Sequence, residues 1–376
     1  MEYILERGGF ECVWIGERHL RDEVLKVKDA KFAEKGSLKA LWHCLTAGVW
    51  ACNVNWRHDI AWVPWCRRVV LLYLDHGMPD KKTGALQLDG HGRAVGGCAA
   101  RMAAKRGIVR ALHVRLRNFF YDESAWGSAI SPMGEKIQLS DTSNWLSADR
   151  MIRCGMPRFD FMIHNAHNLS LRAELRKKYA DILGVPADKR WIIYVPTWRH
   201  EPKDVFSFAN SSNRDRYEQL LERTNAILIE KHHPITIEGR FVSDGQYGSI
   251  TVVSRECSLH IDMQELLLAS DLMITDYSSV YYEFYLMDRP VIHFVYDYDH
   301  FMNVDMGFNF DIREYGGGPF VETEDELLSC LERSDGDLLS MRNDKTREHL
   351  VYETGHACEG YCQLLERLAN GRGKRP

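Results

Sequence analysis

One polar turn in this sequence has the residue types that bind phosphate. It follows the apolar run Leu272 to Ile274 and precedes a predicted helix that ends near Met287. The first turn of a helix exposes backbone N–H groups without partners, and the helix dipole adds positive charge there, so phosphate oxygens bind well. Taken alone, a Ser-Ser pair more often caps a helix than binds an anion. The predicted phosphate-binding residues are Thr275, Asp276, Ser278 and Ser279.

Two histidines are candidates for proton transfer or for binding to phosphate. His76 precedes Gly77, and His233 precedes Pro234. An imidazole changes charge near neutral pH, so a histidine at the end of a strand can act as a general base. The alternative for each is a loop histidine that hydrogen-bonds to its neighbours. His232 points the other way along an extended path and is the bystander of the pair.

Further polar segments follow other predicted strands. In open α/β sheets, ligands bind beyond the carboxyl ends of the strands, so several such segments indicate one cleft between two facing domains. Arg199 and Lys231 add positive charge at this edge, although each could instead be a solvated surface cation. The remaining candidates for substrate or nucleotide binding are Arg158, Pro196, Thr197, Arg199 and Lys231.

Short apolar runs alternate with helical patterns along the whole chain. This alternation is typical of an α/β fold with parallel sheets covered by helices on both faces. Helices are expected over Ser170 to Leu183, Glu324 to Arg333 and about Arg342 to Leu368. The domain boundary is expected near residue 165, giving domains 1–165 and 166–376, with the last helices as candidates to cross back. The predicted strands are Glu11 to Ile15, Val49 to Val54, Val69 to Leu74, Met151 to Cys154, Trp191 to Val195, Ala226 to Glu230, Ser249 to Val253, Leu272 to Ile274 and Val291 to Val295.

Composition narrows the class of protein. A chain of 376 residues suits two domains, and its net charge of −5 gives no general case for binding nucleic acid. Its ten cysteines include no Cys-x-x-Cys pair, which indicates reduced thiols in a cytosolic protein. The N-terminus lacks a signal-peptide pattern, and the longest uncharged segment, Ala40 to Trp56, falls short of the ~20 apolar residues that a membrane span needs. No cluster of carboxylates predicts a Mg²⁺ site, so we expect no metal and no other cofactor.

A basic segment could meet an anionic surface. From Arg93 to Arg117 the sequence holds seven Lys or Arg residues and no acidic residue. Over residues 93–120 the apolar side chains fall on one helical face, a pattern that suits an amphipathic helix lying on an anionic bilayer. An ordinary surface helix packed on its own domain explains the pattern equally well.

The clusters and their order resemble those of the CDP-glycerol glycerophosphotransferase family of wall teichoic acid and capsule synthesis. The resemblance implies a GT-B architecture, with two Rossmann-like domains facing each other across a cleft and the nucleotide held mainly by the second. It also implies monotopic, peripheral association with the cytoplasmic face of the membrane. The matching segments are His76-Gly77-x-Pro79, Gly155-x-Pro157-Arg158-x-Asp160, Pro196-Thr197-Trp198-Arg199, His233-Pro234, Ser270-Asp271-x-x-x-Thr275-Asp276-Tyr277-Ser278-Ser279, Arg289-Pro290 and Gly318-Pro319-Phe320.

The family resemblance implies a reaction and roles for the candidate residues. Glycerol phosphate would pass from CDP-glycerol to a hydroxyl of an undecaprenyl-diphosphate-linked disaccharide, with CMP released. His76 would accept the proton of that hydroxyl, and His233 would hydrogen-bond to phosphate oxygens. The family has a Trp-His-Gly-Thr-Pro-Leu-Lys-like segment, from which this chain departs at Met78 and Asp80. The compact length resembles that of a primase, which adds the first glycerol phosphate.

Several alternatives remain open on the sequence alone. A glycerol or ribitol phosphate polymerase would use the same clusters. A GT-B glycosyltransferase or a sugar-nucleotide epimerase could use similar histidines and hydroxyls around a UDP-sugar. A membrane-surface scaffold without turnover would have no chemical need for His76, His233 and the hydroxyl turn.

Overall fold

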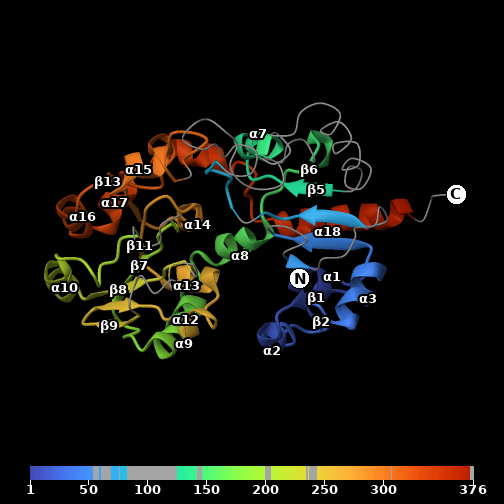
Figure 1. Cartoon of the computed structure of the whole chain (residues 1–376), viewed down its shortest axis with the longest axis horizontal. Helices are drawn as coiled ribbons and strands as arrows, with labels where there is room; N and C mark the ends of the chain where they lie inside the picture. The colour runs from blue at the N-terminus through green and yellow to red at the C-terminus, as the bar shows by residue number, and fades with distance from the viewer. Residues whose placement is uncertain are drawn as a thin grey trace. The chain divides into compact units, whose positions relative to one another are not determined.

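The computed structural model describes residues 1–53, 59–60, 69–75, 77–82, 125–141, 146–199, 205–233, 236, 244–305 and 307–372. His76 and the basic segment 93–120 lie outside these residues. The chain divides into two compact units, shown in Figure 1. Unit 1 comprises Met1–Asp160 and Val351–Pro376, and unit 2 comprises Phe161–Leu350. The division falls within helix α8 (Pro157–Asn165), and the C-terminal segment belongs to unit 1.

Unit 1 contains a parallel sheet whose strands pair in the order β3-β4-β5-β6 and a separate parallel pair, β1 with β2. The strands are β1 (Val13–Gly16), β2 (Lys31–Glu34), β3 (Val49–Cys52), β4 (Val70–Tyr73), β5 (Ala125–Ser128) and β6 (Met151–Ile152). The helices are α1 (Glu2–Arg7), η1 (Arg18–Leu20), α2 (Arg21–Val24), α3 (Leu38–Thr46), α7 (Pro132–Asp141), η2 (Ala148–Arg150) and α18 (Ala357–Arg372).

Helix α18 completes the core of unit 1, although it comes from the far end of the chain (Figure 1). Its Tyr361 and Leu364 share a buried cluster with Val70 and Leu72 of β4. Burying such side chains is the main source of stability in a small α/β unit. Residues more than 280 positions apart in sequence therefore form one core.

Unit 2 contains the larger sheet, in the order β13-β12-β11-β7-β8-β10-β9. Among the described strands, only β9 runs antiparallel to its neighbour. Its strands are β7 (Arg190–Tyr194), β8 (Ala226–Glu230), β9 (Gly245–Tyr247), β10 (Ile250–Val252), β11 (Leu272–Thr275), β12 (Val291–Phe294) and β13 (Phe320–Val321). Its helices are α9 (Leu169–Leu183), α10 (Arg214–Arg223), α12 (Arg255–Ser258), α13 (Met263–Ala269), α14 (Tyr281–Leu286), α15 (Tyr298–Asn303), η4 (Ile312–Glu314), α16 (Glu324–Leu331), α17 (Asp335–Ser340) and η5 (Asp344–Leu350).

Both faces of the unit 2 sheet are buried. On β7, Ile192 and Tyr194 belong to the core cluster that includes Leu220 of α10 and Leu327 of α16. Trp191 is fully buried as well and alternates with them along the strand. Strands with two buried faces are typical of parallel sheets covered by helices.

The predicted strands each overlap an observed strand, and the predicted parallel arrangement is confirmed. Strands β2, β5, β9 and β13 were not predicted. The expected helix from Arg342 to Leu368 is interrupted, because η5 ends at Leu350 and α18 begins only at Ala357. No helix in the described part of the chain combines the length and apolarity that crossing a bilayer requires.

Candidate functional site

The strand order of unit 2 reverses between β7 and β11. From β7 the chain continues to β8 and β10 on one side of the sheet, while β11, β12 and β13 extend the other side. Such a switch point separates the loops that follow its two strands and leaves room for a ligand at the carboxyl edge. Here these loops are the segments after Tyr194 of β7 and Thr275 of β11, which contain most of the predicted site residues.

Asp276 joins the two loops. Its Oδ1 accepts hydrogen bonds from the backbone N–H groups of Thr197 (2.7 Å) and Tyr277 (2.5 Å). The neighbouring Thr275 donates its hydroxyl to the carbonyl oxygen of Val195 at 2.7 Å. Both Thr275 and Asp276 are fully buried. These two predicted phosphate-binding residues are thus engaged within the protein, where they hold the loops after β7 and β11 together.

Arg199 is also engaged within the protein. Its Nη2 donates to Asp276 Oδ2 at 2.8 Å, its Nε to Asp297 Oδ2 at 2.8 Å and its Nη1 to the carbonyl of Thr197 at 2.8 Å. The aromatic ring of Tyr277 lies 5.1 Å from the guanidinium carbon. Burial opposes the charge of Arg199, but the carboxylates of Asp276 and Asp297 outweigh it, so its pKa is raised. The side chain is a buried cation with fixed partners.

The segment from Ser278 to Val280 follows Tyr277 in the chain. It is called the donor turn because its N–H groups and hydroxyls can donate hydrogen bonds. Among the described residues, none accepts a hydrogen bond from the backbone N–H groups or the two hydroxyls of this turn. All three residues are half-buried. Helix α14 starts only at Tyr281 and has six residues, so it begins later than the sequence predicted. Donors on half-buried residues that have no acceptor within the described part of the protein are suited to an anion.

The segment after β8 lies at the same edge, because β8 pairs with β7. The backbone N–H of Lys231 donates to the carbonyl of Tyr194 at 2.9 Å, and burial lowers the pKa of the Lys231 ammonium. His232 is buried and its Nε2 lies 2.8 Å from Glu230 Oε2. His233 is exposed, yet the protein around it desolvates the imidazolium and Lys231 repels it, so its pKa is lowered. A neutral His233 beside a lysine can donate one N–H to a phosphate oxygen.

In unit 1, hydrogen bonds hold Leu74 and Asp75, the described residues just before His76. Asp75 has a left-handed backbone with φ of 61°, which is strained for a residue with a side chain. Its Oδ2 accepts a hydrogen bond from Gln138 Nε2 of α7 at 2.7 Å, and Ser128 Oγ donates to the carbonyl of Leu74 at 2.6 Å. The segment that follows β4 is therefore attached to both β5 and α7 at Leu74 and Asp75.

Asp80 lies further along the same loop. Burial raises the pKa of its carboxyl, which the Lys81 ammonium opposes at an Nζ to Oδ1 distance of 3.3 Å. The side chain is almost fully buried. Asp80 is one of the two positions, with Met78, at which the sequence departs from the segment that it resembles.

The motif around Arg158 has a structural role that the sequence did not reveal. Asp160 accepts hydrogen bonds from the N–H groups of Ala357 (3.0 Å) and Cys358 (2.7 Å) and thus caps α18. Gly155 has φ of 85°, and a Cβ there would lie 2.3 Å from a carboxylate oxygen of Glu353. Arg158 lies over the ring of Phe159, with 5.0 Å between the guanidinium carbon and the ring centroid.

The Arg-Pro motif is structural as well. The Nη1 of Arg289 donates to the carbonyl oxygens of Leu267, Leu268 and Ser270 at 2.6 to 3.1 Å and satisfies the C-terminus of α13. Burial lowers the pKa of Arg289 to about 10. The aspartate of the Ser270-Asp271 pair forms ion pairs with Arg172 and Arg176 of α9. Arg289 therefore holds the end of α13, and Asp271 holds α9 beside the start of β11.

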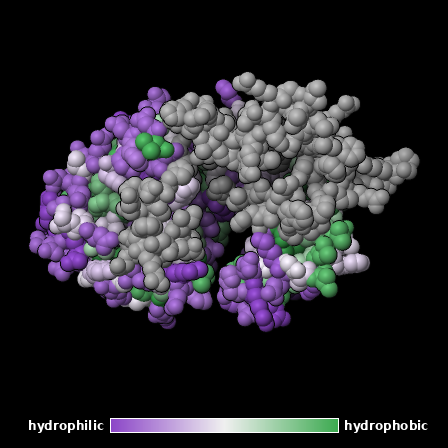
Figure 2. Space-filling model, viewed as in Figure 1, coloured by the Kyte–Doolittle hydropathy of each residue, from purple (hydrophilic) through white to green (hydrophobic). Residues whose placement is uncertain are grey.

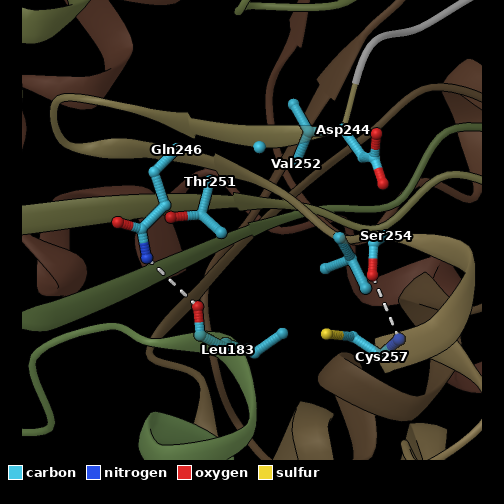
Figure 3. A pocket seen from close by; sticks show the side chains of 9 residues that line it. Leu183, Asp244, Gln246, Thr251, Val252, Ser254 and Cys257 are labelled. Atoms are coloured by element: carbon cyan, nitrogen blue, oxygen red, sulfur yellow. Dashed lines mark hydrogen bonds between the residues drawn. The ribbon is translucent and has the colours of Figure 1, made fainter.

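Two hollows in the described part of the chain lie away from the switch point. A hollow of about 230 Å³ lies between the β9-β10 edge and α12, as Figure 3 shows, where Gln246 Nε2 donates to the carbonyl of Leu183 at 3.3 Å. A second, of about 370 Å³, lies along α7 in unit 1. Neither contains a predicted site residue. The described part of the chain holds no group of three or more side chains placed to bind a metal ion.

Comparison with known proteins decides the family. Residues 1–366 match the family described as CDP-Glycerol:Poly(glycerophosphate) glycerophosphotransferase. The chain belongs to this glycerophosphotransferase family. The predicted family and its class of enzyme are thereby confirmed.

Several members of the glycerophosphotransferase family are similar along most of the chain. The teichoic acid poly(glycerol phosphate) polymerase of Bacillus subtilis (strain 168) is 28% identical over 82% of this chain and 39% of its own length. The teichoic acid glycerol-phosphate transferase of Staphylococcus aureus (strain NCTC 8325 / PS 47) is 24% identical over 97% of this chain and 87% of its own. The chain thus spans about two fifths of the first relative and most of the second.

A solved structure supports the fold. The wall teichoic acid polymerase TagF has a TM-score of 0.73 to this chain at 20% identity, covering 100% of this chain and 86% of its own. At that identity the likeness bears on the fold alone, and it confirms the predicted α/β, GT-B fold class.

Proposed function

We propose that this protein transfers glycerol phosphate from CDP-glycerol to a hydroxyl of an undecaprenyl-diphosphate-linked disaccharide, releasing CMP, in wall teichoic acid synthesis. The observation that carries the proposal is the donor turn, residues Ser278 to Val280, at the switch point of unit 2. Its N–H groups and hydroxyls have no hydrogen-bond acceptor among the described residues. A diphosphate supplies such acceptors.

The residues around the donor turn divide into two groups. Ser278, Ser279, Lys231 and His233 would contact the diphosphate directly, because they are half-buried or exposed at the carboxyl edge of the sheet. The frame behind them consists of Thr275, Asp276, Arg199, Thr197 and Pro196. Phosphoryl transfer depends mostly on positioning and fixed charge, so a rigid frame of this kind is what the reaction requires.

The reaction needs no reactant other than CDP-glycerol and the acceptor hydroxyl. The acceptor oxygen attacks the phosphorus that bears glycerol, and a new P–O bond forms. The bond from that phosphorus to the bridging oxygen breaks, and the oxygen leaves with CMP. His76 takes the proton of the acceptor hydroxyl, and His233 hydrogen-bonds to the departing phosphate. The fixed residues Asp75 and Leu74 hold the start of the His76 loop.

We expect the reaction to need no metal ion. Two carboxylates at this edge of the sheet, those of Asp276 and Asp297, are ion-paired with Arg199. A Mg²⁺ ion would need carboxylates with free oxygens. In this proposal the hydroxyls, the N–H groups and Lys231 neutralise the phosphate charge instead.

The lipid-linked acceptor implies peripheral attachment to the cytoplasmic face of the membrane. The expected contact over residues 93–120 lies outside the described residues, but α3 adds an apolar stripe. Leu38, Leu41, Trp42 and Leu45 follow a helical spacing and are 85%, 39%, 65% and 60% exposed. Figure 2 shows an apolar area on the face that carries α3. Leucine and tryptophan on one helical face suit the boundary between lipid headgroups and acyl chains.

Donor specificity tests the proposal. Purified protein is incubated with a short-chain lipid-linked disaccharide and with CDP-glycerol, CDP-ribitol or UDP-sugars in turn, and free nucleotide is measured. CMP from CDP-glycerol is the expected result. UDP released from a UDP-sugar, with none from either CDP-alcohol, would replace the proposal with a glycosyltransferase.

A polymerase is the second candidate function. The similarity to the Bacillus subtilis polymerase over 82% of this chain favours it. The number of glycerol phosphates per acceptor separates the two, since a primase adds one and a polymerase adds many.

A further inference from the structure

His293 is a buried polar side chain on β12 that the proposed mechanism does not use. It is fully buried, and a buried imidazole is costly unless its ring nitrogens are hydrogen-bonded. Its Nε2 accepts a hydrogen bond from the backbone N–H of Gly317 at 3.0 Å. Its Nδ1 lies 3.1 Å from the carbonyl oxygen of Asp276.

These two partners fix the protonation of the ring. A backbone N–H can only donate, so Nε2 carries no proton and Nδ1 must donate to the carbonyl of Asp276. Burial lowers the pKa of His293 to about 4, which keeps the ring neutral at physiological pH. The ring is therefore a fixed, uncharged connection between Gly317 and Asp276.

The aromatic neighbours hold the ring in one orientation. Phe320 stacks on it at 4.5 Å between centroids and 10° between planes, and Tyr281 meets it edge-on at 4.8 Å. The segment that contains Gly317 lies close to β12, and only a glycine fits at position 318. A Cβ there would lie 1.8 Å from the carbonyl oxygen of Val291. His293 thus has little freedom to turn away from Asp276.

Only Tyr277 separates Asp276 from the donor turn. Its side chain is held by Thr197 and Arg199 on the β7 side, and its carbonyl is held by His293 on the β12 side. The main chain just before Ser278 and Ser279 is therefore anchored at Asp276, through the side chain and through the carbonyl group of that residue. Removing the β12 attachment leaves the peptide between Asp276 and Tyr277 held only through its N–H, which donates to Asp276 Oδ1.

We infer that His293 is a positioning residue that sets the main-chain direction of the donor turn through the carbonyl of Asp276. This inference rests on the proposed function in one respect, that the donor turn binds the diphosphate. It adds a residue that touches no substrate and yet controls affinity for it.

Two amide variants separate the two hydrogen bonds of His293. The side-chain nitrogen of His293→Asn can take the place of Nδ1 and still donate to Asp276. The longer side chain of His293→Gln reaches the place of Nε2, where its Oε1 can accept the hydrogen bond from the N–H of Gly317. Each variant is the matched control for the other, because both are polar, neutral and of similar size.

Calorimetric titration of each variant with CMP and with CDP-glycerol tests the inference. We expect His293→Asn to bind within about threefold of wild type, and His293→Gln to bind about tenfold more weakly, the effect of one hydrogen bond. The Michaelis constant for CDP-glycerol should rise with it, while kcat changes less. Equal affinity in the two variants, or tighter binding by His293→Gln, would overturn the assignment.

Amide hydrogen exchange of the ligand-free protein adds a measurement that does not depend on the reaction. Exchange over residues 276–280 should be faster in His293→Gln than in His293→Asn. If wild type binds neither nucleotide, the proposed function fails, and this exchange comparison still decides the role of His293. Equal exchange in both variants contradicts it.

Discussion

Replacing Ser278 and Ser279 by alanine should remove substrate binding and leave the fold intact. Neither hydroxyl has a hydrogen-bond partner among the described residues, and both side chains are half-buried at the carboxyl edge of unit 2. Their loss should therefore change the free energy of unfolding by less than about 0.5 kcal/mol. A hydrogen bond to a charged phosphate contributes about 1.5 to 3 kcal/mol. Each substitution should thus lower kcat/KM for CDP-glycerol by about 10- to 150-fold.

The assay is CMP release at limiting CDP-glycerol, with urea unfolding of the same preparations. Ser329→Ala is the matched control, because that hydroxyl lies on α16 of the same unit and donates to the carbonyl of Asp325. The control should retain wild-type kcat/KM. If the double variant keeps kcat/KM within twofold of wild type, the donor turn does not bind the diphosphate and the reasoning is refuted.

Further predictions concern the frame, the pH dependence, the membrane and metals. Arg199→Met should lower the free energy of unfolding by about 3 to 5 kcal/mol, because it leaves carboxylates unpaired in a buried site; unchanged urea unfolding would contradict this. Burial lowers the pKa of His349 to about 4 from an ordinary 6.5. The neutral ring therefore contributes fully to the free energy of unfolding above pH 6.5, and this contribution is lost as the pH falls toward 4. His349→Phe should therefore flatten the loss of stability between pH 6.5 and 4.5, and an unchanged slope would exclude this cause. Trp42→Ala with Leu45→Ser should reduce co-sedimentation with anionic phosphatidylglycerol vesicles at least several-fold, whereas Leu169→Ser on unit 2, 76% exposed, should not; equal loss in both would remove α3 from the contact. Chelation by EDTA should leave the rate of CMP release unchanged, and a loss that Mg²⁺ restores would show metal dependence.

The sequence predicted the five inner strands of the unit 2 sheet, because they are apolar, short and bounded by turns, and it missed the edge strands β9 and β13. Trp191 to Val195 and Leu272 to Ile274 both read as buried strands, and both are. The polar segments after them were placed at one edge, since parallel strands end on the same side. The strand β2 (Lys31–Glu34) was missed, because its charged ends and length of four residues give a weak pattern.

The sequence could not show which polar side chains the fold itself uses. Asp276 and Thr197 are 79 positions apart, and their hydrogen bond exists only because β7 and β11 are neighbours in the sheet. The same holds for Arg199, whose partners Asp276 and Asp297 come from two later loops. A sequence motif identifies these residues, but it does not show whether a side chain contacts the substrate or holds the loops in place. His293 gave no signal at all, as it stands inside an apolar strand.

The central claim is that the chain moves glycerol phosphate onto a lipid-linked sugar. Intact-mass analysis of the acceptor after incubation with CDP-glycerol tests it most directly. The proposal predicts an acceptor that gains the mass of one glycerol phosphate per molecule, in step with the CMP released. An acceptor of unchanged mass, with folded protein and CDP-glycerol both present, would contradict the proposed reaction.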